Sequence, residues 1–70
     1  MDRQTLLNLL MRRPFEPFVI KLSSGESLEV RHPENAALGR SRLIVIDPYT
    51  DQMSIAALLH IASIETAQAA

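Results

Sequence analysis

Residues 15–34, FEPFVIKLSSGESLEVRHPE, constrain the fold more than any other part of the chain. Two alternating segments flank a Ser-Ser-Gly sequence, a pattern typical of a β-hairpin. The apolar residues fall at Phe18 and Ile20 in the first segment and at Leu28 and Val30 in the second. Because side chains alternate between the faces of a strand, we expect these four residues on the inward face of the hairpin.

The same alternation predicts the length of the hairpin loop. A two-residue loop would set Ile20 against Glu29, whereas the three-residue loop Ser23–Gly25 pairs Ile20 with Leu28. The glycine then takes the third loop position, where a type I turn with a G1 bulge requires positive φ. On the exposed face this register makes Lys21 a diagonal neighbour of Glu29, and we expect a weak ion pair between them.

The preceding segment, residues 2–13, predicts a short amphipathic helix. Asp2 is the expected N-cap, and Leu6 and Leu10 share the apolar face. Two arginines fall in the expected last turn, where positive charge suits the helix dipole. Pro14 ends the helix because the residue before a proline is pushed out of the α region. A helix this short is unstable alone, so its apolar face is expected to pack on the sheet.

The chain beyond the hairpin predicts more short strands. Pro33 ends the second strand, and residues 36–39 are expected to form one helical turn that ends at a glycine. The run Leu43, Ile44, Val45 and Ile46 is apolar at every position. This pattern is typical of a strand with the core on one face and a helix or a partner chain on the other. Two further strands are expected at residues 52–57 and 61–65, with a tight turn or 3₁₀ link between them at residues 58–60.

These segments predict one small domain over residues 1–70. We expect a mainly β fold with one N-terminal α-helix, a β-rich module over residues 15–65 and a frayed tail at residues 66–70. The module is expected to be a small five-stranded antiparallel barrel or bent sheet. A chain of this length buries only about 60% of its unfolded surface, so its core is small.

The order of elements, the glycine hairpin and the Leu-His-Ile-x-x-Ile-Glu ending resemble Sm-like and SH3-like small barrels. Two strings, RRPFEPFVIKLSSGESLEVRHPEN at residues 12–35 and SIAALLHIASIE at residues 54–65, carry a more specific resemblance. They are similar to a family of short bacterial proteins that share an R-P-F-x-P-F-x-I-x-L-x-x-G core followed by H-P-E. That resemblance implies no assigned activity.

Composition favours a binding or assembly role over catalysis. Hydrophobic residues make up 47% of the chain, which is high for so short a domain with a net charge of −1. We therefore predict a homo-oligomer in which Leu43, Ile44, Val45 and Ile46 contribute to self-association. No apolar run approaches the roughly 20 residues that a membrane span needs, and no secretion signal opens the chain, so a cytoplasmic protein is expected.

Nucleic-acid binding is the alternative function. The candidate contact residues, for a nucleic acid or another partner, are Arg31, His32, Arg40, Arg42 and Tyr49. Sm-like barrels often bind RNA, and Tyr49 is the aromatic residue expected to be exposed enough to stack on a base. The acidic balance of the chain, with a pI of about 6.0, argues against a dedicated nucleic-acid binder.

Catalysis and metal binding have weaker support in the sequence. No serine has a base at a recognisable spacing and no phosphate-binding glycine loop occurs, so we predict neither an enzyme nor a cofactor. His32, Glu34 and His60 could ligate a metal if the fold brought them together. The simpler interpretation is that His32 continues the inward face of its strand, while Glu34 caps the turn that follows.

Overall fold

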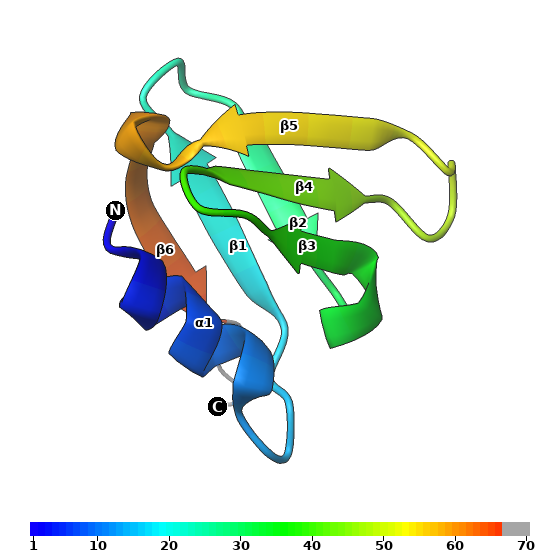
Figure 1. Ribbon diagram of the computed structural model, residues 1–70. Coiled ribbons are helices and arrows are strands. Elements are labelled where there is room, and N and C mark those ends of the chain that lie inside the picture. The colour runs from blue at the N-terminus through cyan, green and yellow to red at the C-terminus, as the bar shows by residue number, and fades with distance from the viewer. Residues whose placement is uncertain (67–70) are drawn as a thin grey trace.

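The computed structural model describes residues 1–66 and consists of one α-helix, six β-strands and two 3₁₀ turns in that range (Figure 1). The elements in chain order are α1 (Arg3–Met11), β1 (Phe18–Leu22), β2 (Ser27–Val30), η1 (Pro33–Asn35), β3 (Ala36–Leu38), β4 (Arg42–Ile46), β5 (Met53–Ala57), η2 (Leu58–His60) and β6 (Ile61–Thr66).

The strands form two three-stranded antiparallel sheets. Their orders are β2-β1-β6 and β3-β4-β5, and Figure 1 shows the second sheet crossing the first. The mainly β fold with an N-terminal helix is confirmed. The prediction of five strands is wrong because β3 is a sixth, and the two sheets do not form a closed barrel.

The hairpin has the register that alternation predicts. Ile20 pairs with Leu28, and the Leu22 amide donates to the Glu26 carbonyl at 2.8 Å across a three-residue loop. Gly25 closes the loop with φ +95°, and its amide donates to the Leu22 carbonyl at 2.9 Å. The predicted ion pair between Lys21 and Glu29 is wrong. The Lys21 ammonium lies 3.8 Å from a carboxylate oxygen of Glu65 on β6, and Glu29 pairs with Arg31 instead.

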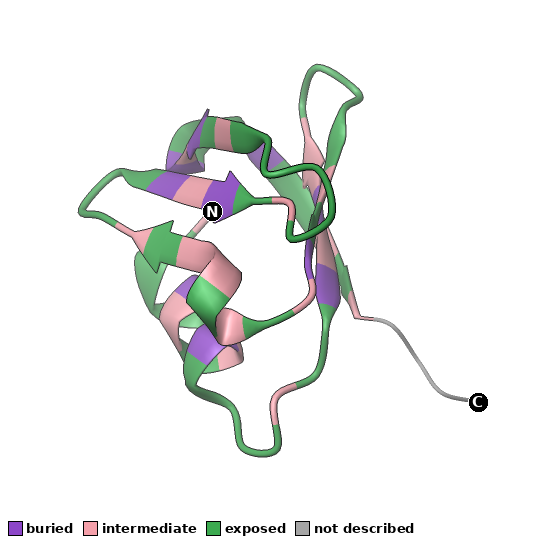
Figure 2. Cartoon of the chain, turned by 90° about the vertical axis from the view of Figure 1, so that its right-hand side faces the viewer, coloured by how far each residue is buried: buried purple, intermediate pink, exposed green. Residues whose placement is uncertain are grey.

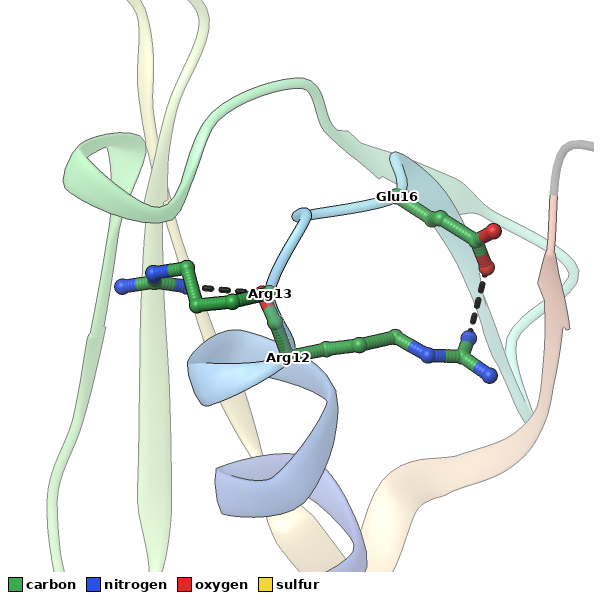
Figure 3. Close-up of polar contacts among 3 residues, drawn as sticks. All are labelled: Arg12, Arg13 and Glu16. Atoms are coloured by element: carbon green, nitrogen blue, oxygen red, sulfur yellow. Dashed lines mark hydrogen bonds and ion pairs between the residues drawn. The ribbon is translucent and has the colours of Figure 1, made fainter.

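The helix begins and ends close to the predicted residues. Asp2 is the N-cap, and its carboxylate accepts a hydrogen bond from the Gln4 amide at 3.4 Å. The two arginines lie just beyond the helix rather than in its last turn. Arg13 donates to the Leu10 carbonyl at 3.2 Å and to the Arg12 carbonyl at 2.8 Å. Figure 3 shows the second of these bonds and the 2.7 Å ion pair between Arg12 and Glu16. Both side chains thus brace the elbow between the helix and β1.

The core lies between the two sheets, and the helix adds two leucines to it. Figure 2 shows that buried residues lie mostly on the strands and the helix, and η2 adds the buried Leu58. Phe15 packs against the cluster from the elbow, with its ring centroid 6.0 Å from that of Phe18. The buried cluster consists of Leu6, Leu10, Phe18, Ile20, Val30, Leu43, Val45, Leu58 and Ile61.

Three predictions after the hairpin need correction. Residues 36–38 form β3 rather than a helical turn, because pairing with β4 outweighs the helix propensity of alanine. His32 is exposed rather than inward-facing, because the chain leaves the sheet after Val30 and enters η1 at Pro33. Thr66, expected in the frayed tail, is the last residue of β6, and the rest of that tail lies outside the described residues.

The hairpin loop generates a stability prediction. A Cβ built on Gly25 meets no atom within 4 Å, so a substitution there acts through the backbone conformation rather than through a clash. We expect Gly25→Val to lower the free energy of unfolding by about 1–2 kcal/mol, measured by urea denaturation. Gly25→Asn is the matched control, because asparagine tolerates positive φ and should lose clearly less. Equal losses in the two variants would contradict this explanation.

Candidate interaction surface

The outward-facing sides of the two sheets differ in chemistry. On the β2-β1-β6 sheet, Lys21, Glu29 and Glu65 project outward beside Val19. On the β3-β4-β5 sheet, the strand pairs Ile44–Ile55 and Ile46–Met53 project outward instead. One sheet therefore presents a charged surface to solvent, whereas the other presents an apolar one.

Strand β4 divides its apolar run between two environments. Leu43 and Val45 are buried in the core, while Ile44 is half-buried and Ile46 is 36% exposed. Of the four residues predicted to contribute to self-association, only Ile44 and Ile46 face away from the core. The helix does not cover this outer side, since both of its buried leucines belong to the core cluster.

We call this surface the outer face; it consists of Ala37, Ile44, Ile46, Met53, Ile55 and Ala57. Met53 and Ile55 are each 59% exposed, and no charged residue interrupts the face between its ends. Single exposed apolar residues are ordinary, whereas this face gathers several of them side by side, which makes it the candidate interaction surface of the described residues.

A shallow groove of about 400 Å³ continues the outer face around the edge of β5. The tip of the first hairpin forms its other wall, held near η2 by a 2.8 Å hydrogen bond from the Ser23 amide to the His60 carbonyl. Ile55 belongs both to the outer face and to the groove. The groove is lined by Leu22, Ser23, Ser24, Ile55, Ala56, Ala57 and His60.

Two of the predicted contact arginines lie at one end of the outer face. Arg40 lies in the tight turn that joins β3 to β4, and Arg42 is the first residue of β4. A 2.8 Å hydrogen bond from the Gly39 amide to the Arg42 carbonyl closes this turn. Arg3 reaches the same turn from the helix and donates through Nε to the Gly39 carbonyl at 3.0 Å. Three arginines, none of them in an ion pair within residues 1–66, therefore surround this turn.

The other predicted contact residues lie at the opposite end of β4. The Arg31 guanidinium stacks over the Tyr49 ring, 4.8 Å from its centroid, and forms a 2.9 Å ion pair with Glu29. A polar cleft of about 160 Å³ lies beside them between β2 and the β4–β5 turn. His32 follows Arg31 but is exposed and joins neither group. The fold thus separates the predicted arginine cluster into two.

Metal ligands do not converge in the described part of the chain. Among residues 1–66, no group of three or more histidine, cysteine, aspartate or glutamate side chains could hold a metal ion. His32, Glu34 and His60 therefore do not form the site considered from the sequence. In the same range, no helix is long and apolar enough to cross a membrane.

Comparison with known proteins adds no relative. The chain matches no protein-family model, and no curated protein or solved structure is significantly similar to it.

Sequence reasoning missed four members of the outer face, which are Ala37, Met53, Ile55 and Ala57, and did not include Arg3 among the candidate contact residues. Met53 and Ile55 alternate with Ser54 and Ala56, so the period of their strand did signal one large apolar face. Which face was buried depended on the pairing with β4, where Ser54 lies opposite the buried Val45. No sequence signal places Arg3 beside the β3–β4 turn, because that contact spans 36 positions.

The Arg31–Tyr49 contact generates a second prediction. We expect a double-mutant cycle of Arg31→Ala and Tyr49→Ala to show a favourable coupling of about 0.5–1 kcal/mol in urea unfolding, as for an exposed cation–π pair. His32→Ala with Tyr49→Ala is the control cycle and should show none. A coupling of zero in the first cycle would mean that Arg31 does not depend on Tyr49 for its position.

Proposed function

We propose that this protein is a non-enzymatic interaction module that associates with a second copy of itself through the outer face. The observation that carries the proposal is the contrast between the two sheets: one presents Lys21, Glu29 and Glu65 to solvent, and the other presents Ile55 and its apolar neighbours. An identical apolar face on a second copy would remove both from water at once, without leaving a charge buried.

The size of the surface sets the expected affinity. Strands β3, β4 and β5 have three, five and five residues. At about 3.3 Å per residue and about 4.8 Å between strands, they cover only about 210 Å². A stable interface takes about 800 Å² from each partner, so the groove beside β5 and the flanking turns have to contribute. Association also costs translational and rotational freedom. We therefore expect a complex that dissociates on dilution rather than a permanent one.

The wider features of the proposal follow the arrangement of elements. We place the fold with the Sm-like and SH3-like small barrels, in an open form, and place the protein in the cytoplasm. What supports the fold assignment is that η2 leads directly into β6, which pairs with β1, so that the last strand lies beside the first. The bulge that shifts the register between Lys21 and Leu22 lets this pairing continue to the start of β6.

Nucleic-acid binding is the second candidate, favoured by one observation. Arg3 joins Arg40 and Arg42 at the β3–β4 turn. The amide of Leu58 in η2 donates to the Ser41 carbonyl within the turn. Positive charge therefore gathers at this end of the molecule, although the net charge is −1.

The outer face predicts the effect of a buried charge on assembly. We expect Ile55→Asp to convert the protein to a monomer, because association would bury an unpaired carboxylate. Light scattering after size exclusion, over a range of protein concentrations, measures the mass. Met11→Asp is the matched control, since Met11 is 64% exposed but lies at the end of α1, away from the outer face and the groove beside β5. A wild-type protein that stays monomeric at the highest concentration would refute self-association.

The arginine turn predicts how nucleic-acid binding would respond to salt. If the second candidate is correct, single-stranded RNA should bind with an affinity that falls steeply between about 50 and 200 mM salt, because binding releases counterions. Arg40→Ala should weaken binding at low salt and flatten this dependence, measured by fluorescence anisotropy. Arg12→Ala is the control, because Arg12 pairs with Glu16 at the elbow. Absence of binding at low salt would remove this candidate.

A further inference from the structure

We propose that the two copies pack outer face to outer face with their strands running in opposite directions, so that Arg42 of each copy meets Asp51 of the other. This inference rests on the proposed self-association and adds its geometry and its specificity. It follows from the positions of charge at the two ends of the outer face.

The outer face has a centre that the register defines. Its large side chains form the pairs Ile44–Ile55 and Ile46–Met53, and the pair Val45–Ser54 lies midway between them. Arg42 precedes Val45 by three residues, and Asp51 precedes Ser54 by three residues. Because β4 and β5 are antiparallel, the two charges lie at opposite ends of the face: Arg42 is about 10 Å from the centre along β4, and Asp51 lies beyond Met53 in the β4–β5 turn.

Both charged groups are available to a partner. Within residues 1–66, neither the Arg42 guanidinium nor the Asp51 carboxylate forms a hydrogen bond or an ion pair, and both residues are exposed. Arg40 lies in the turn just before Arg42 and strengthens the positive end. At the other end, the Asp47 carboxylate accepts from the Tyr49 and Thr50 amides, so Asp51 is the uncommitted acid there.

Two symmetric arrangements can bring identical faces together, and charge distinguishes them. A twofold axis along the strands places each end over the same end of the partner, so that Arg42 meets Arg42 and Asp51 meets Asp51. A twofold axis across the strands exchanges the ends, so that Arg42 lies over the acidic turn of the second copy. Like charges brought together are unfavourable, so the second arrangement is selected.

The experiment reverses the charges separately and together. In the proposed arrangement, Arg42→Glu brings two carboxylates together at both ends, and Asp51→Arg brings two guanidinium groups together. Each single variant should raise the dimer dissociation constant by about tenfold or more, measured by sedimentation velocity at low salt. The double variant R42E/D51R, which exchanges the charges, should return to within about threefold of the original value.

Two further variants keep the test independent of folding. Asp51 has φ +62°, which asparagine tolerates, so Asp51→Asn removes the charge without straining the turn and should also weaken association. Arg12→Glu makes the same charge change as Arg42→Glu, but at the elbow, and should leave association unchanged. Thermal unfolding of each variant shows whether the fold is retained.

The outcomes separate this inference from the function on which it rests. If the single charge variants associate as strongly as the original protein while Ile55→Asp is monomeric, the outer face is the interface but the end-exchanged geometry is wrong. If neither set of variants changes the mass of an oligomer, another surface carries the association and both proposals are wrong. Weakening by each single variant and recovery in R42E/D51R would support both.

Discussion

The register of the β1–β2 hairpin is the constraint on which the rest of the structure depends. With three residues in its loop, Phe18, Ile20 and Val30 all face inward, and each is fully buried. A shift by one residue would put Val30 on the opposite face from Phe18 and Ile20 and would break up the surface against which the helix and β4 pack. Gly25 permits that loop because its φ of +95° costs a glycine little. The positive φ of Gly25 thus allows the hairpin register on which the packing of the core depends.

The small size of the core explains why the two outer faces can differ so much. In a domain of this length few side chains can be fully enclosed, so several large apolar residues remain at the surface wherever they fall. On the first sheet, the outward positions carry charge and the Lys21–Glu65 pair. On the second sheet, the same kind of position carries isoleucine and methionine. Folding alone does not require this second pattern, and association with a second copy would give it a physical reason.

The sequence predicts elements whose signals are local. The helix with its Asp2 cap, the three-residue hairpin loop and the 3₁₀ link before β6 all follow from residues close together in the chain. Strand β3 was missed because its alanines favour a helix and only pairing with β4 makes them a strand. The two sides of β4 could not be ranked, since all of Leu43–Ile46 is apolar. Arg40 and Arg42 lie apart from Arg31 because the length of β4 separates them. The end of β4 that each arginine occupies depends on strand pairing, which the sequence does not reveal.

Charge and apolar area would have different roles on the outer face. Burial of Ile55 and Met53 would supply free energy but no orientation, because the hydrophobic effect has no direction. Exposed ion pairs contribute little to affinity, but like charges in register oppose a wrong arrangement. Arg42 begins β4 and Asp51 lies in the turn that leads into the neighbouring strand β5, so an arginine crossing to the acid on the facing copy must reach sideways by about one strand spacing, ~4.8 Å. The length of the arginine side chain allows this, and a lysine, with a single point charge, would make a less directional contact.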